Sequence, residues 1–163
     1  MVLLCVPLLA VVQACPQLDS ASARRPCWAQ RITMDDSRTS DGALPPGAEE
    51  PHCDSEGLFL PKQCSGSECY CVDPYGKQLG YSKSRWETDD MMCKCALKED
   101  EIQKDGRPGV SIKCDELGNY HHTQCTGTSC YCVHPHSGEK KIGTESNIND
   151  IDRLEARCAS GAN

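Results

Sequence analysis

The sequence predicts a small disulfide-rich α+β protein made of two tandem modules. Each module is expected to hold a short helix, a small antiparallel hairpin, irregular loops and three disulfides. Three observations predict this fold class. The chain of 163 residues contains 14 cysteines, and only 5% of its residues are aromatic. A cysteine-rich segment occurs twice, 61 residues apart. Cross-links are therefore expected to replace the large apolar core that this composition cannot supply.

Residues 1–23 are predicted to be a secretory signal peptide, because their apolar run is shorter than the roughly 18 to 20 residues that span a bilayer. Cleavage after Ala14 or after Ala23 fits the pattern. Cleavage after Ala23 removes Cys5 and Cys15 and leaves twelve cysteines, which can all pair, whereas cleavage after Ala14 leaves thirteen. We favour Ala23 and expect a secreted, extracellular protein.

The charge of the chain bears on its partners. The formal net charge is −7, and it becomes −6 once Asp19 leaves with the signal peptide. A mildly acidic chain is a poor candidate for nucleic-acid binding. We expect a monomer that binds neither nucleic acid nor membrane.

The internal repeat divides the mature chain. CDSEGLFLPKQCSGSECYCVDPY (53–75) aligns without a gap on CDELGNYHHTQCTGTSCYCVHPH (114–136), with eleven identities in 23 positions. Each module, predicted at 24–93 and 94–163, holds six cysteines. They are Cys27, Cys53, Cys64, Cys69, Cys71 and Cys93 in the first, and Cys95, Cys114, Cys125, Cys130, Cys132 and Cys158 in the second. Only Lys94 separates the two sets, so we expect a fixed arrangement of the modules.

Local patterns predict the elements of each module. Short polar helices are expected at 27–37 and 95–106, the second ending at Gly106, and a weaker pattern predicts a final helix at 145–157 with Ile148, Ile151 and Leu154 on one side. Gly and Pro mark 39–51 as a loop. The hairpins are predicted to pair 57–63 with 69–72, and 118–124 with 130–133.

Six cysteines per module permit fifteen pairings, and spacing alone does not choose among them. A bond between Cys69 and Cys71 is disfavoured, because their side chains lie on the same face of an extended strand. Cys64 and Cys69 are placed to pair across a tight turn, and so are Cys125 and Cys130.

Four motifs of the first module resemble the thyroglobulin type-1 repeat: Pro51-His52-Cys53-Asp54, Gln63-Cys64, Cys69-Tyr70-Cys71-Val72 and the Gly76 to Gly80 segment. The resemblance covers residues 27–93 and 95–158. It implies that the cysteines pair first with second, third with fourth and fifth with sixth. The implied bonds are Cys27–Cys53, Cys64–Cys69, Cys71–Cys93, Cys95–Cys114, Cys125–Cys130 and Cys132–Cys158.

Several modules of this family inhibit papain-like cysteine proteases by inserting a wedge of loops into the active-site cleft. Others inhibit aspartic proteases, and many inhibit nothing. The resemblance implies a papain-like, cathepsin-type protease as partner, competitive binding and no cofactor. By resemblance the wedge comprises Ala43, Leu44, Pro45 and Pro46, then Ser65, Gly66 and Ser67, then Pro74, Tyr75 and Gly76.

The second module departs from this pattern. Only 18 residues separate Cys95 from Cys114, against 25 between Cys27 and Cys53, so its first loop is shorter. We therefore expect the main inhibitory surface in the first module. Two-module proteins of this kind also resemble arthropod venom or gland secretions, which raises a toxin as a further interpretation.

Three other functions compete with inhibition. The four histidines of the second module, His121, His122, His134 and His136, could join C-x-C cysteines in a zinc site, and a Cys-His pair could catalyse. Both readings need free thiols, which complete pairing removes. The acidic runs at 49–50, 89–90 and 99–101 are expected to be solvated faces. An extracellular module that binds a growth factor, matrix component or receptor is the main alternative.

Overall fold

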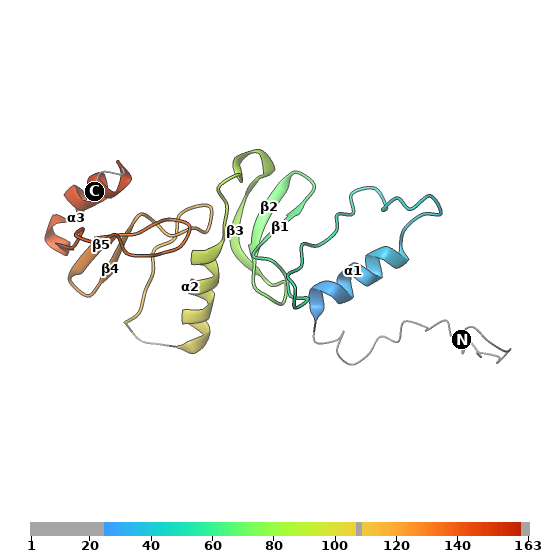
Figure 1. The fold of residues 1–163 in the computed structure, drawn as a ribbon, viewed down its shortest axis with the longest axis horizontal. Coiled ribbons are helices and arrows are strands. Elements are labelled where there is room, and N and C mark those ends of the chain that lie inside the picture. Colours follow the sequence, from blue (N-terminus) through green and yellow to red (C-terminus); the bar gives the residue numbers. More distant parts are fainter. Residues whose placement is uncertain (1–24, 107–108, 161–163) are drawn as a thin grey trace.

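The computed structural model of the chain describes residues 25–106 and 109–160, so the predicted signal peptide lies outside the described residues. Figure 1 shows an elongated molecule in which α1, a first small sheet, α2, a second small sheet and α3 follow one another from one side to the other. Each sheet has three strands, in the orders β1-β2-β3 and β4-β5-β6. The predicted disulfide-rich α+β fold class is confirmed.

The elements follow the predicted order, with two additional strands and two 3-10 turns. The first module contains α1 (Pro26–Asp36), β1 (Lys62–Ser65), β2 (Glu68–Val72), β3 (Gln78–Ser84) and η2 (Arg85–Glu87). The second contains α2 (Lys94–Asp105), β4 (Thr123–Thr126), β5 (Ser129–Cys132), β6 (Ser146–Asn147), η3 (Ile148–Asp150) and α3 (Ile151–Ala159). Residues 39–51 form no helix or strand, as predicted.

The predicted first strands, 57–63 and 118–124, begin too early. The structure starts β1 at Lys62 and β4 at Thr123. Before β1, the Asp54 carboxylate accepts hydrogen bonds from the backbone N–H of Glu56 and of Leu58, both at 2.9 Å, and this closes a turn. Gly57 takes the left-handed conformation, with φ at 82°, that this turn requires. The final helix also begins later than predicted, at Ile151.

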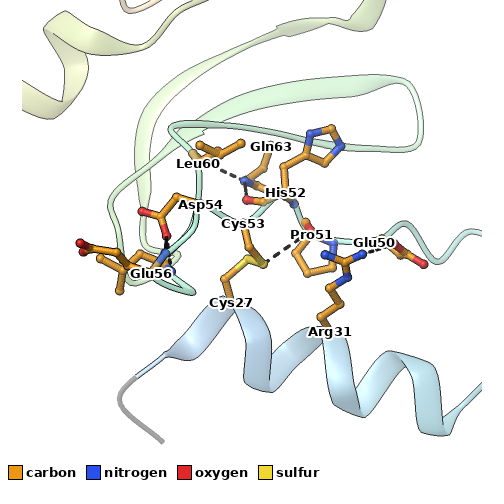
Figure 2. The surroundings of a disulfide bond; sticks show 11 residues. Cys27, Arg31, Glu50, Pro51, His52, Cys53, Asp54, Glu56, Leu60 and Gln63 are labelled. Carbon is orange, nitrogen blue, oxygen red and sulfur yellow. Dashed lines mark hydrogen bonds and ion pairs between the residues drawn. A yellow bond between two sulfur atoms is a disulfide. The ribbon is translucent and has the colours of Figure 1, made fainter. Parts of the chain in front are cut away.

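The repeated glutamine of the Gln-Cys motif has the same structural role in both modules. The Gln63 amide accepts a hydrogen bond from His52 N–H at 2.9 Å and donates to the His52 carbonyl at 2.8 Å (Figure 2). Gln124 makes the same two bonds to Lys113, at 3.0 and 2.7 Å. Both amides are buried, so each secures the chain beside the second cysteine of its module.

The structure contains all six disulfides that the resemblance implies, so every cysteine within 25–106 and 109–160 is paired. Cys64 and Cys69 face each other across the β1–β2 hairpin, and Cys125 and Cys130 across the β4–β5 hairpin. Seven of the twelve cysteines are at most 1% exposed and Cys158 is 6% exposed, and these eight form most of the buried apolar core of the described residues.

Helix α2 joins the two modules, because it opens the second module and packs on the sheet of the first. Ala96 lies in one buried cluster with Cys69, Cys71 and Met91, and Leu79 and Tyr81 of β3 pack against that cluster. Gly118 of the second module fits tightly here, since a Cβ would lie 2.8 Å from the Cys71 sulfur. The modules therefore hold a fixed relation, as the short Lys94 connection indicated.

Polar contacts extend this junction. The Tyr81 hydroxyl donates to Glu99 at 2.7 Å, and burial, followed by Glu99, raises the pKa of Tyr81 to about 12. Asp100 pairs with Lys77 of the first module at 3.3 Å and its side chain is 13% exposed. Glu99 and Asp100 are thus interface residues. The expectation that 99–101 is a solvated face was wrong for both.

Asp73 ties the first module to α2 and yields a pH prediction. Its carboxylate is 4% exposed and accepts a bond from Lys104 at 3.0 Å. Burial alone would raise the pKa of Asp73, but hydrogen bonds from Lys104 and from two backbone N–H groups outweigh it and lower the pKa. The stabilisation that ionised Asp73 gives to the folded state is therefore complete above the ordinary carboxyl pKa of about 3.9. It is lost as the pH falls through the lowered pKa of Asp73.

We expect Asp73→Asn to keep the turn but lose the ion pair, which lowers the free energy of unfolding by about 1 kcal/mol at pH 7, given the exposure of Lys104. Denaturant unfolding at pH 7 and at pH 2.5 measures this. The difference between the two proteins should shrink at the acidic pH. An equal difference at both values would contradict the assignment.

Helix α3 covers the second sheet as α2 covers the first. Leu154 and Cys158 are buried against Cys130 and Cys132, and Ile151 packs against this cluster. Ile148 is 40% exposed, so it does not share the buried side with Leu154 as predicted. None of the helices within the described ranges is long and apolar enough to cross a bilayer.

Candidate functional site

The loop between α1 and β1 is held at both of its ends. The Cys27–Cys53 disulfide fixes the chain beside the start of α1 (Figure 2). Thr39 fixes the other end of the loop. Its backbone N–H and its hydroxyl both donate to the Ala43 carbonyl, at 2.9 and 3.0 Å. Between these fixed points, Ala43 and Pro46 are exposed and Leu44 and Pro45 are half-buried.

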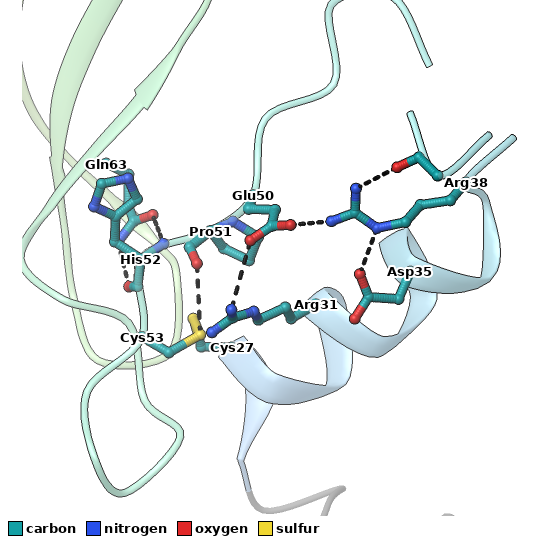
Figure 3. Close-up of polar contacts among 10 residues, drawn as sticks. Cys27, Arg31, Asp35, Arg38, Glu50, Pro51, His52, Cys53 and Gln63 are labelled. Atoms are coloured by element: carbon teal, nitrogen blue, oxygen red, sulfur yellow. Dashed lines mark hydrogen bonds and ion pairs between the residues drawn. A yellow bond between two sulfur atoms is a disulfide. The ribbon is translucent and has the colours of Figure 1, made fainter. Parts of the chain in front are cut away.

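Glu50 links this loop to α1. Figure 3 shows its carboxylate between Arg31 of α1, at 3.5 Å, and Arg38, which follows the helix and pairs with Glu50 directly. Arg38 also contacts Asp35 at 2.9 Å and donates to the Gly42 carbonyl at 2.9 Å. The Asp35 hydrogen bond is the main cause that raises the pKa of Arg38. One arginine therefore braces the loop at both ends.

Glu49 brings three segments together at one end of the first sheet. Its Oε1 accepts a hydrogen bond from the Gly66 backbone N–H at 3.2 Å, in the turn of the β1–β2 hairpin. Its Oε2 pairs with Arg85 of η2. Arg85 N–H in turn donates to the Ser67 carbonyl at 2.8 Å. The expectation that 49–50 is a solvated acidic pair was therefore wrong, since both carboxylates hold the loop in place.

The structure links the loop that contains Ala43 to Pro46 to the hairpin turn of Ser65 to Ser67 through Glu49. Ser65 to Ser67 form the turn at the end of the sheet where Glu49 binds, and Ala43 to Pro46 precede Glu49 in the same loop. Pro74, Tyr75 and Gly76 lie at the opposite end, because β2 pairs with β3 from Glu68–Ser84 at one end to Val72–Gln78 at the other. The turn after Val72 therefore does not adjoin the hairpin turn.

Residues of η2 stand where the third loop was expected. Trp86 is 81% exposed next to Arg85, which contacts both Glu49 and the hairpin turn. An exposed tryptophan in such a position is a strong candidate for contact with a partner. Sequence reasoning missed it because β3 was not predicted. The alternation of Leu79 and Tyr81 with polar residues was the available signal.

We call this end of the first module the hairpin-end surface, made of Ala43 to Pro46, Ser65 to Ser67 and Arg85 to Glu87. At the corresponding end of its own sheet, the second module has a different surface. There Ile148 N–H donates to the Thr128 carbonyl at 2.9 Å, as Arg85 does to Ser67, so Asn149 takes the place of Trp86.

Neither competing site chemistry finds support in the described part of the chain. It contains no group of three or more His, Cys, Asp or Glu side chains that could hold a metal ion. His121 and His122 stack on each other at 4.1 Å, and burial followed by His121 lowers the pKa of His122. All its cysteines are in disulfides, so none is a thiol nucleophile.

The thyroglobulin type-1 repeat pattern matches residues 27–95 and again residues 91–152. The chain belongs to the thyroglobulin type-1 repeat family. Both modules carry the repeat, and the two matches span nearly all of the described residues.

Similar proteins differ widely in length. Bovine (Bos taurus) thyroglobulin is 28% identical over 123 residues, which is 72% of this chain and 4% of thyroglobulin. The mouse (Mus musculus) H-2 class II histocompatibility antigen gamma chain is 49% identical over 78 residues, 47% of this chain and 25% of that protein. U20-hexatoxin-Hi1a of Hadronyche infensa is 32% identical over 94 residues, 54% of this chain and 62% of the toxin. The chain thus matches only a small part of thyroglobulin and of the gamma chain.

Proposed function

We propose that this protein is a secreted inhibitor of papain-like cysteine proteases and that the hairpin-end surface of its first module enters the active-site cleft. Thyroglobulin type-1 modules are known from cysteine protease inhibitors. The observation that carries the proposal is the convergence on Glu49, which binds both the hairpin turn and η2 and lies in the same loop as Leu44-Pro45-Pro46.

The physical properties of this surface suit an inhibitor. Its loops are braced by two disulfides and by the Glu49 and Glu50 contacts, so little conformational entropy is lost when they bind. Leu44, Pro45 and Pro46 offer apolar and stiff contact atoms. The two prolines also lack a backbone N–H, so these positions cannot donate the main-chain hydrogen bonds that hold a cleavable peptide in the cleft.

Titration of the oxidised protein against a papain-like cysteine protease, with pepsin in parallel, tests the proposal. Tight competitive inhibition of the cysteine protease alone is expected. Inhibition of pepsin alone would change the target class. Inhibition of neither enzyme would favour the second candidate, an extracellular module that binds a growth factor, matrix component or receptor.

Inhibition should be measured with the intact two-module protein. Separating the modules at Cys93 would remove α2 from the first sheet and expose Cys69, Cys71 and Met91 to water. Loss of inhibition by the separated first module would then report loss of packing. Substitutions in the intact protein avoid this confusion.

Trp86→Ala is expected to weaken inhibition of the cysteine protease at least about tenfold, because exposed tryptophans at an interface commonly dominate binding. Inhibition kinetics of the variant and of Asn149→Ala, the matched change in the second module, provide the measurement. The free energy of unfolding should hardly change in either variant, since Trp86 is 81% exposed. Equal inhibition by wild type and Trp86→Ala would remove η2 from the binding surface.

A further inference from the structure

The repeated Tyr between the two cysteines of C-Y-C meets different surroundings in the two modules. In the second module the Lys140 ammonium lies over the Tyr131 ring, 4.5 Å from its centroid. The Tyr131 hydroxyl also lies 3.4 Å from the Thr126 hydroxyl. Among the described residues of the first module, no cation lies over the ring of Tyr70. Tyr70 instead lines a groove on the sheet.

The sequence explains this difference at one position. In the second module Val133 pairs with Lys140, and in the first the equivalent Val72 pairs with Gln78. Gln78 therefore occupies the place from which Lys140 reaches the tyrosine ring. A glutamine carries no charge, so the first module cannot complete the same cation–π contact from within the chain.

The groove over Tyr70 lies on the face of the first sheet opposite α2. Cys69 and Cys71 point toward α2, so their neighbours Tyr70 and Val72 face the other way. Gln30 of α1 forms part of one wall and Gly76 lies at one end. Among the described residues that line the groove, Glu49 is the one charged group, and it is paired with Arg85, which is not part of the lining; no lining residue is a lysine, arginine or histidine.

We propose that this groove is a binding site for a cationic side chain, a lysine or arginine from an extended segment of a partner polypeptide, with its charge over the ring of Tyr70. The chain supplies the precedent, because Lys140 makes this contact with Tyr131. The side-chain amide oxygens of Gln30 and Gln78 add acceptors for the donor groups of the cation. The site does not depend on protease inhibition.

Amide chemical shifts of the isotopically labelled intact protein provide the test. The probe is the peptide Ac-Gly-Lys-Gly-NH2, and the matched probe replaces lysine with norleucine, which keeps the four-carbon chain and removes the ammonium group. The lysine peptide should shift the amides of Ser65, Gly76 and Gln78 in a saturable way. The norleucine peptide should bind at least about fivefold more weakly than the lysine peptide. The matching amides of Thr126 and Gly138 should not move.

Gln78→Lys is the decisive variant. The introduced side chain should lie over Tyr70, show ring-current shifts of its terminal methylene protons, and abolish binding of the lysine peptide. Gln78→Met adds similar bulk without a charge, so this variant should retain part of its binding of the lysine peptide. Equal binding of both peptides, no saturable shift, or full binding by Gln78→Lys would each overturn the proposal. No protease is used, so failure here leaves the inhibitor proposal to its own test.

Discussion

Replacing Leu44-Pro45-Pro46 with Gly-Ser-Gly is expected to weaken inhibition of a papain-like cysteine protease about 100-fold. The change removes apolar contact area and also loosens a loop that Thr39, Glu49 and Glu50 otherwise hold in one conformation. Both effects reduce affinity, the first through lost burial and the second through the entropy of ordering the loop. A loss of about 100-fold corresponds to about 2.7 kcal/mol.

The measurement is the inhibition constant of the variant beside that of a matched variant in which Val110-Ser111-Ile112 becomes Gly-Ser-Gly. That segment belongs to the corresponding loop of the second module, between Cys95 and Cys114. The second variant should inhibit like the wild type. The reverse pattern, with loss only in the second variant, would place the inhibitory surface in the second module.

Removing the Cys71–Cys93 disulfide by a double alanine substitution is expected to lower the free energy of unfolding by about 3 kcal/mol. The bond closes a separation of 22 residues and both cysteines are 0% exposed. In the chain-entropy description, a loop of this length accounts for about 3 kcal/mol. The loss should weaken the module junction as well, because Cys71 and Cys93 belong to the cluster that contains Ala96 of α2.

The matched control removes Cys64–Cys69, which closes a separation of only 5 residues. The same description gives about 2 kcal/mol for it, so this variant should be the more stable of the two. Denaturant unfolding of both variants, with the remaining disulfides verified by mass, supplies the comparison. An equal or larger loss from the Cys64–Cys69 variant would show that loop closure does not govern the stability of this module.

Those features of the fold that depend on short segments could be predicted from the sequence. The helix that ends at Gly106 is one, since Gly106 has φ at 61° and its N–H bonds to the Gln103 carbonyl. The turns between Cys64 and Cys69 and between Cys125 and Cys130 are others. The resemblance supplied the long-range disulfides, such as Cys27–Cys53, which spacing left open.

The features that sequence reasoning missed depend on contacts between distant segments. Glu49 looked like a solvated carboxylate, and its role arises only when the hairpin turn and Arg85 fold beside it. Glu99 and Asp100 likewise become interface residues only because α2 packs on the preceding module. The placement of Pro74 to Gly76 depends on β3, which returns the chain along β2 to the hairpin end.

Protection of the catalytic cysteine of the protease tests the central claim most directly. The protease is treated with an alkylating reagent, with and without a saturating amount of the intact inhibitor, and the rate of cysteine modification is followed by mass. Occupation of the cleft by the hairpin-end surface predicts a rate that falls in proportion to the bound fraction. The Leu44-Pro45-Pro46 variant should protect less at the same concentration, in proportion to its smaller bound fraction. A complex that forms while the cysteine is alkylated at its free rate would contradict binding in the cleft.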